Sequence, residues 1–242
     1  MIQSAQFNTA ASSYTQFATI QNQIGQTLLK HIHPSHKIKG SALDFGCGSG
    51  ALTSQLTQYA HTVIGYDPAP AMIEHARQSH AQTHCTLDWT SNRSAIQDNG
   101  PFSLVFSNAA LQWVNNLNKT IAFLAKNCQT QLLFSVFGPK TFQELASIWP
   151  KPIIASQFQP LSHYERLVSR YFPHVSASYH RIVYDYASLT ELLQTIKGTG
   201  AYVPSSSGLL TPRQLQHLES NYLNQYGVIK ATYDYVIVDG RY

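Results

Sequence analysis

Three glycines alternate with other residues in the segment Gly46-Cys47-Gly48-Ser49-Gly50, directly after an apolar stretch at residues 41–45. Glycine has no Cβ atom, so the chain can turn tightly there and its backbone can approach a ligand closely. Such a loop between a strand and a helix is typical of nucleotide-binding sites. The spacing is G-x-G-x-G, whereas a loop that seats a pyrophosphate reads G-x-G-x-x-G. The pattern therefore favours a nucleoside without phosphates, and a ligand-free tight turn is the alternative.

Polar residues follow the next three predicted strands. Asp67 ends the second strand, about twenty residues after the loop, where a carboxylate can accept hydrogen bonds from both ribose hydroxyls. Asp88 and Trp89 end the third strand, so a carboxylate could bind an adenine amino group and an indole could cover the base, although Asp88 alone would also suit a turn. Asn108 ends the fourth strand, and ligands of open parallel sheets lie at these carboxyl ends. We expect the cofactor-binding residues to be Gln21, Asp44, Gly46, Cys47, Gly48, Gly50, Asp67, Pro68, Asp88, Trp89 and Asn108.

The alternation of apolar runs and turn residues from about residue 41 to residue 137 predicts strands that alternate with helices. This order forms a parallel sheet with crossover helices. We expect strands at Ser41–Phe45, His61–Asp67, Thr83–Asp88, Phe102–Asn108 and Gln131–Phe137, and helices after Gly50, at Pro70–Gln78 and at Asn116–Lys126.

An amphipathic helix should precede this core, because Tyr14, Phe17, Gln21, Ile24 and Leu28 recur at helical spacing. After the core, two short helices are interrupted by prolines, which suggests an inserted lid. We expect one domain, with a helical cover at 1–38, a cofactor-binding core at 39–137, a lid at 138–175 and further strands and helices at 176–242. The later elements are expected at Thr141–Ile148, Ser162–Tyr171, His180–Tyr186, Ser188–Lys197, Pro212–Tyr226 and Ala231–Val238.

The composition narrows the class of partner. Charged residues make up only 12% of the 242 residues, and the formal net charge is +4. No run of Lys and Arg forms the basic patch expected of a nucleic-acid binder. A mildly basic surface favours an acidic partner, although it also suits an ordinary solvated surface.

Metal binding and a membrane anchor are not expected. Cys47, Cys85 and Cys128 lack metal-ligand spacing and suit a reducing compartment. His31, His33 and His36 lie in a turn without acidic companions. The first thirty residues do not resemble a secretory signal, and the longest apolar runs are shorter than the ~20 residues of a membrane span. We therefore expect a cytoplasmic protein.

The glycine loop, the acid that follows the second strand and the order of strands resemble the class I methyltransferases, over residues 39–137 and the closing strand. The resemblance implies a Rossmann-like α/β fold, mostly parallel with an antiparallel closing strand, and S-adenosylmethionine as cofactor. It does not indicate which acceptor is methylated.

Segments outside the core resemble the malonyl-acyl carrier protein O-methyltransferases of biotin synthesis. These are Phe7-Asn8-Thr9-Ala10-Ala11-Ser12-Ser13-Tyr14, with Ala18 and Gln21 one and two turns later, then Ser107-Asn108-Ala109-Ala110-Leu111-Gln112-Trp113, Ile196-Lys197-Gly198-Thr199-Gly200-Ala201, Leu210-Thr211-Pro212-Arg213-Gln214-Leu215 and Ala231-Thr232-Tyr233. One departure is the absence of an Arg beside Phe158, whose role in holding the substrate or its carrier would pass to Lys151 or Arg166 or be weaker here.

The resemblance implies methyl transfer to the free carboxylate of malonyl-acyl carrier protein or malonyl-CoA, by a protein that we expect to be a monomer. A malonyl carboxyl has a pKa near ~4 and is already a nucleophile at neutral pH, so no general base is required. We expect Tyr14, Gln112 and Trp113 to be the catalytic residues, although Tyr14 and Trp113 could simply pack the core. Two alternatives stay open: a methyltransferase for another small acid or a quinone, and a non-catalytic S-adenosylmethionine-binding protein.

Overall fold

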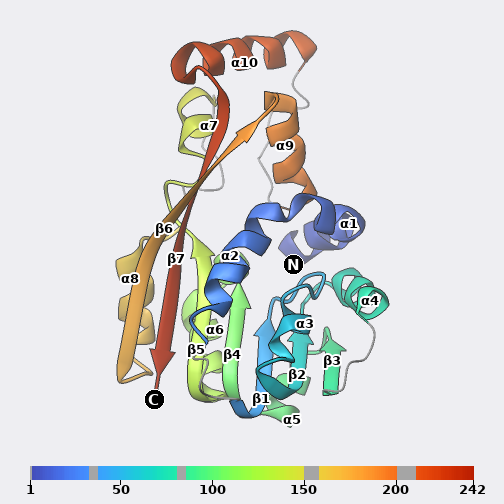
Figure 1. Ribbon diagram of the computed structural model, residues 1–242, viewed down its shortest axis with the longest axis vertical. Coiled ribbons are helices and arrows are strands. Elements are labelled where there is room, and N and C mark those ends of the chain that lie inside the picture. The colour runs from blue at the N-terminus through green and yellow to red at the C-terminus, as the bar shows by residue number, and fades with distance from the viewer. Residues whose placement is uncertain (1, 33–37, 81–85, 150–157, 201–210) are drawn as a thin grey trace.

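The computed structural model describes residues 2–32, 38–80, 86–149, 158–200 and 211–242 (Figure 1). Its centre is a seven-stranded sheet in the order β3-β2-β1-β4-β5-β7-β6. Neighbouring strands from β3 to β5 are parallel, and β7 runs antiparallel to both β5 and β6. This is the predicted sheet with its antiparallel closing strand. The strands are β1 (Ile38–Phe45), β2 (Ala60–Tyr66), β3 (Thr86–Thr90), β4 (Phe102–Asn108), β5 (Cys128–Phe137), β6 (His174–Tyr186) and β7 (Ile229–Arg241).

Helices connect the strands and cover both faces of the sheet (Figure 1). One core packs α2 and α3 against β1, β4 and β5, and the other packs α5, α6 and α8 against the opposite face. The helices are α1 (Ile2–Phe17), α2 (Thr19–Leu29), α3 (Thr53–Leu56), α4 (Pro70–Ser79), α5 (Ser94–Asn99), α6 (Leu117–Lys126), α7 (Gln143–Ile148), α8 (Leu161–Val168), α9 (Leu189–Gly198) and α10 (Pro212–Tyr226), with one 3-10 turn, η1 (Leu111–Trp113).

The N-terminal helix is divided, which corrects the expectation of one continuous helix. Ala18 has φ −83° and ψ 25°, outside the helical region, and separates α1 from α2. The predicted apolar face from Tyr14 to Leu28 is therefore divided between two helices that pack against different parts of the protein. Ile24 and Leu28 of α2 are buried in the core over the sheet, whereas α1 packs against α4 and α9 above the carboxyl ends of the parallel strands (Figure 1).

The expected lid at 138–175 is also divided. Helix α8 packs against β6 and β7, and its Tyr164, Leu167 and Val168 belong to the core on the sheet face opposite α2. Helix α7 instead packs against β7 and α10. Helix α8 lies on the sheet, and not over the cavity end, because its apolar stripe is buried only by packing against the strands. The segment 150–157 between them, with Lys151, Pro150 and Pro152, lies outside the described residues.

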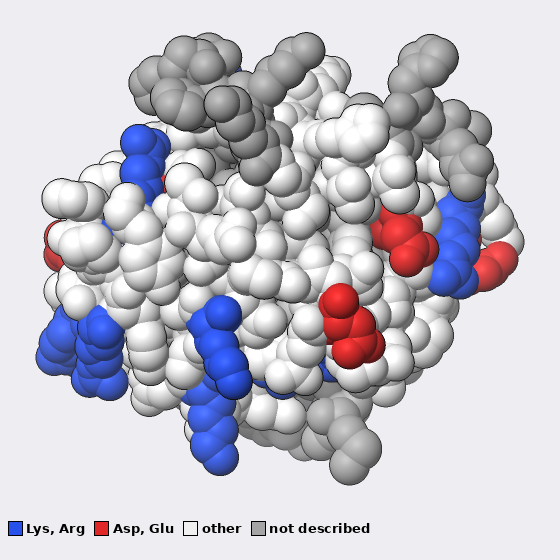
Figure 2. All heavy atoms as spheres, turned by 90° about the horizontal axis from the view of Figure 1, so that it is seen from below, with Lys and Arg blue, Asp and Glu red and all other residues white. Residues whose placement is uncertain are grey.

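The surface carries few charges. On the face seen from below, Lys and Arg stand at several separate places over a mostly uncharged surface (Figure 2). No helix among the described residues is long and apolar enough to cross a membrane.

Candidate functional site

A cavity of about 460 Å³ opens above the carboxyl ends of the parallel strands, between the glycine loop and α1. Its volume is in the range of sites for small-molecule cofactors. Seven of the predicted residues line it. They are Tyr14, Gly46, Gly48, Asp67, Pro68, Asn108 and Trp113.

Backbone hydrogen bonds join the glycine loop to the end of β2. The N–H groups of Gly46 and Cys47 both donate to the carbonyl of Tyr66, at 2.7 and 3.0 Å. Gly46 has φ +80°, and a Cβ placed on it would lie 2.3 Å from the Cβ of Ala110. Any larger residue would collide with the segment that follows β4, so glycine is required at this floor of the cavity.

The carboxylate of Asp67 is held by two backbone amides at the cavity wall. One oxygen accepts from the N–H of Gly48 at 3.0 Å, and the other accepts from the N–H of Ala69 at 2.8 Å. Each carboxylate oxygen has a second lone pair, so both can still accept a bond from a ligand hydroxyl. The position suits the predicted role toward a ribose.

A second acid, Asp44, lies beneath the loop and is 2% exposed. Its carboxylate accepts a hydrogen bond from the Thr53 hydroxyl at 2.6 Å. Burial raises the pKa of Asp44 to about 7, and burial likewise raises the pKa of Asp67 to about 6. Neither acid forms an ion pair within the described chain. A ligand with a positive charge would compensate the two carboxylates, and S-adenosylmethionine, a sulfonium ion, fits this requirement.

Tyr14 covers the glycine loop from α1. Its ring lies 3.6 Å from a Cβ placed on Gly48, and it lines the cavity. Burial, followed by the charges of Asp67 and Asp44, raises the pKa of Tyr14, which stays protonated. The phenol can therefore donate one hydrogen bond into the site.

Asn108 ties the end of β4 to helix α2. Its amide nitrogen donates to the backbone carbonyl of Gln21 at 2.9 Å, and its oxygen accepts from the Ser135 hydroxyl at 2.7 Å. The Asn108 amide thus closes one end of the cavity and fixes the start of α2 over the sheet.

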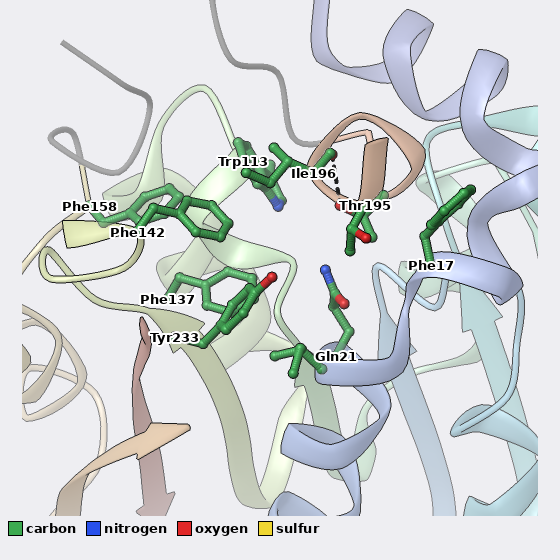
Figure 3. A pocket seen from close by; sticks show the side chains of 11 residues that line it. Phe17, Gln21, Trp113, Phe137, Phe142, Phe158, Thr195, Ile196 and Tyr233 are labelled. Atoms are coloured by element: carbon green, nitrogen blue, oxygen red, sulfur yellow. Dashed lines mark hydrogen bonds between the residues drawn. The ribbon is translucent and has the colours of Figure 1, made fainter. Parts of the chain in front are cut away.

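A second, largely aromatic pocket lies beside the first, between α2, α9 and the ends of β5 and β7 (Figure 3). Trp113 lines both spaces and so lies where they adjoin. Trp113 packs edge-on against Phe7 and Phe158. We call this second space the aromatic pocket. It is lined by Phe17, Ile20, Gln21, Trp113, Phe137, Phe142, Phe158, Thr195, Ile196, Thr199 and Tyr233.

Asp88 and Trp89 do not reach the cofactor cavity, which corrects their predicted placement. Strand β3 continues to Thr90, so neither residue ends it. Asp88 is exposed and its carboxylate accepts from the N–H of Trp89. The indole is buried against the glycine loop, where a Cβ on Gly50 would lie 2.3 Å from it. Trp89 supports the loop from behind, and Gly50, which also does not line the cavity, makes room for it.

Four further predicted residues lie outside the cofactor cavity, and one of them is Asp44 beneath the glycine loop. Gln21 lines the aromatic pocket instead. The Gln112 amide nitrogen donates to the carbonyl of Ala109 at 2.7 Å, and Gln112 lines neither space. Cys47 packs beneath the loop with Ile73 and Trp89, as expected of a small apolar residue.

Several lining residues were not predicted. Arg93 immediately precedes α5, lines the cofactor cavity and packs its guanidinium over the Phe123 ring. The position of Arg93 shortly after the third strand could have identified it as a residue near the carboxyl end of the sheet. In the aromatic pocket, Phe137 is the last residue of β5 and Tyr233 belongs to β7. Only the antiparallel pairing of these two strands brings the two side chains together.

No group of three metal-ligating side chains lies together among the residues that the structure describes. His33, His36 and Cys85 lie outside that part of the chain.

Comparisons with known proteins agree with this geometry. The methyltransferase-domain family matches residues 17–196. Among solved structures, magnesium protoporphyrin IX methyltransferase of Synechocystis with bound S-adenosylhomocysteine superposes with a TM-score of 0.57 at 14% identity, covering 96% of this chain and 86% of that one. The YcgJ protein of Bacillus subtilis superposes with a TM-score of 0.60 at 12% identity, covering 91% and 97%. Fold and site together define a class I methyltransferase that uses S-adenosylmethionine.

Relatives with closer sequences narrow the family. The malonyl-[acyl-carrier protein] O-methyltransferase of Anoxybacillus flavithermus is 30% identical over 259 aligned positions, covering 96% of this chain and 94% of the relative. The protein of the same name from Erwinia pyrifoliae is 27% identical over 223 positions, covering 89% and 83%. The chain belongs to this family of carboxyl methyltransferases.

Proposed function

We propose that this enzyme transfers the methyl group of S-adenosylmethionine to the free carboxylate of malonyl-acyl carrier protein, which yields the methyl ester that starts pimeloyl-chain synthesis for biotin. Malonyl-CoA is the alternative thioester. A cytoplasmic location and a monomeric state belong to the same proposal. The names of the relatives support the acceptor, and the chemistry of the aromatic pocket supports it independently.

The observation that carries the proposal is the lack of a general base among the described residues of the aromatic pocket, which lies beside the cofactor cavity. The described residues that line the aromatic pocket include no Asp, Glu, His, Lys or Arg. Its one phenol, Tyr233, has a pKa that burial raises, so it does not accept a proton at neutral pH. A phenol or hydroquinone acceptor has a pKa near ~10 and needs a base, whereas a carboxylate with a pKa near ~4 does not.

S-adenosylmethionine supplies an electrophilic methyl group on a positively charged sulfur. Transfer forms the bond between the carboxylate oxygen and the methyl carbon and breaks the bond from that carbon to sulfur, whose electron pair stays on sulfur. No proton moves. Because opposite charges are neutralised as the methyl moves, water stabilises the separated reactants and opposes the reaction, so a dry site favours it.

The residues of this chain therefore have positioning roles. Asp67 holds the nucleoside beside the glycine loop, and Trp113, which lines both the cofactor cavity and the aromatic pocket, excludes water where the two spaces meet. We assign to the Tyr14 hydroxyl the positioning of the reacting carboxylate, because it is a neutral donor above the glycine loop. A neutral donor is preferable to a cation here, since an ion pair would stabilise the ground-state carboxylate and slow the transfer.

Mass spectrometry tests the proposal. Purified enzyme with S-adenosylmethionine should add the mass of one methylene group to malonyl-acyl carrier protein and nothing to the acetyl form, which lacks the carboxylate. A protein that binds the cofactor but leaves malonyl-acyl carrier protein and malonyl-CoA unmodified would contradict the proposal. Methylation of a quinone or of another small acid would replace it.

A further inference from the structure

Three neutral polar groups point into the aromatic pocket from three different elements. Figure 3 shows the indole nitrogen of Trp113, the amide nitrogen of Gln21 and the hydroxyl of Tyr233 directed toward the same space. They come from η1, α2 and β7. All other walls near them are aromatic or aliphatic side chains, apart from two threonines of the α9 region.

Two of these groups are donors without a protein partner among the described residues. Gln21 uses only its backbone carbonyl, which accepts from Asn108, and the Trp113 side chain makes ring contacts alone. An indole N–H can only donate, and an amide nitrogen supplies two donors. Donors that meet in a mostly apolar pocket and bond to no described side chain or backbone group are suited to an oxygen atom of a ligand.

The third group, the Tyr233 hydroxyl, is oriented by a second tyrosine. The hydroxyls of Tyr233 and Tyr186 lie 2.5 Å apart, and both side chains are buried. Burial raises the pKa of Tyr186 to about 12 and also raises that of Tyr233, so both carry their protons. When Tyr186 donates to Tyr233, the Tyr233 proton is free to point into the pocket, and such a chain strengthens the outer bond.

The free volume of the aromatic pocket limits the size of the group that the three donors can bind. The volume open to a solvent-sized atom in the aromatic pocket is about 10 Å³. This is room for about one water molecule, and hence for one oxygen atom of a larger group. Trp113 places that space next to the cofactor cavity.

We propose that Trp113, Gln21 and Tyr233 form an oxygen-binding subsite that holds the non-attacking oxygen of the acceptor carboxylate. This inference rests on the proposed carboxylate acceptor. The other carboxylate oxygen then faces the cofactor cavity, where it attacks. Three neutral donors recognise an anion without the strong ion pair that would slow its methylation. The subsite also selects malonyl over acetyl thioesters, because a methyl group in place of the carboxylate leaves the donors unpaired.

A binding experiment without turnover tests the subsite. Malonyl- and acetyl-acyl carrier protein are titrated by calorimetry into the enzyme saturated with S-adenosylhomocysteine. We expect wild-type enzyme to prefer the malonyl form. Gln21→Met and Tyr233→Phe remove one donor each while preserving shape, and each should reduce that preference about tenfold, the effect of one charge-assisted hydrogen bond. Affinity for the acetyl form and for S-adenosylhomocysteine should stay within twofold.

Matched controls make the same chemical changes outside the pocket. Gln23→Met alters an exposed glutamine of the same helix, and Tyr222→Phe removes a buried tyrosine hydroxyl that donates to the Lys230 carbonyl. Both should keep the wild-type preference. If Gln21→Met and Tyr233→Phe also keep it, the subsite is wrong, even when wild-type enzyme methylates malonyl-acyl carrier protein. If wild-type enzyme methylates only another acceptor, the proposed function fails instead.

Discussion

The backbone N–H of Gly48 donates to the carboxylate of Asp67 at 3.0 Å, which joins the glycine loop to the end of the second strand. Asp67 thus stabilises the shape of the loop and also places a carboxylate in the wall of the cofactor cavity. The link explains why the loop and the acid occur together in the sequence. It also means that a change at Asp67 affects both ligand binding and loop geometry.

Replacing Asp67 with Ala should weaken S-adenosylmethionine binding at least tenfold. The variant loses charge-assisted bonds to the ligand, each worth about 1.5–3 kcal/mol, and about 1.4 kcal/mol corresponds to a factor of ten. Calorimetry measures the affinity, and circular dichroism confirms that the variant is folded. Unchanged affinity in a folded variant would remove Asp67 from the binding site.

The stability of the ligand-free protein should fall as the pH rises from about 4 to about 7 because of the two buried acids. Their ordinary pKa is 3.8, and the fold raises it to about 7 for Asp44 and to about 6 for Asp67. Between these values the folded state binds more protons than the unfolded state, so stability decreases with pH. The urea midpoint of Asp44→Asn, which cannot titrate, should depend less on pH over this window.

S-adenosylmethionine should reverse this trend, because its positive charge favours the ionised acids. Binding should therefore tighten as the pH rises through about 6 to 7, and protons should be released on binding at pH 6. Calorimetry in two buffers with different ionisation enthalpies counts the protons. Uptake of protons at that pH would show that the acids do not face the ligand charge.

Tyr14→Phe should reduce methyl transfer ten- to a hundredfold while the ring remains over the glycine loop. A loss of ~1.4 kcal/mol at the transition state corresponds to each factor of ten. Affinity for the cofactor should fall much less than turnover, and the melting temperature should change little. A variant within twofold of wild-type activity would show that Tyr14 is only a packing residue.

Gly50→Ala should destabilise the protein more than Gly227→Ala. Both glycines have a positive φ, +83° and +75°, so both variants carry backbone strain of about 1–3 kcal/mol. Only at Gly50 would the new Cβ meet another group, the Trp89 ring at 2.3 Å, whereas nothing lies within 4 Å at Gly227. Chemical denaturation measures the free energy of unfolding of the two variants, and the difference between their losses is the cost of the collision with Trp89. Equal losses would mean that the indole moves aside without cost.

Encounter with an acidic carrier protein should weaken with salt, because the chain has a net charge of +4. Arg166, predicted from the sequence as a replacement for the missing Arg, lies in α8, and Arg170 follows that helix. Both are exposed, and neither lines either cavity. Reversing both to Glu should therefore change the KM for malonyl-acyl carrier protein less than twofold. Lys197→Glu, on the helix whose Thr195 and Ile196 line the aromatic pocket, should raise it more. The opposite order would place the carrier protein on α8.

The sequence by itself determined the order of strands and helices, the glycine loop, and the roles open to Asp67 and Asn108. These features are local: a strand, a turn and a helix follow one another in the chain, and parallel strands bring their carboxyl ends to one edge of the sheet. Motifs spread from Phe7 to Tyr233 then indicated the family, without showing how they meet in space.

Tertiary structure alone decided which side chains face which space. Successive residues of a strand point to opposite faces, so the end of β3 and its pairing with β2 place Trp89 behind the glycine loop. The break at Ala18 turns Gln21 away from the cofactor, and the antiparallel pairing of β7 with β5 brings Tyr233 to the same pocket. Such placements depend on packing between residues far apart in the chain, which a local pattern does not contain.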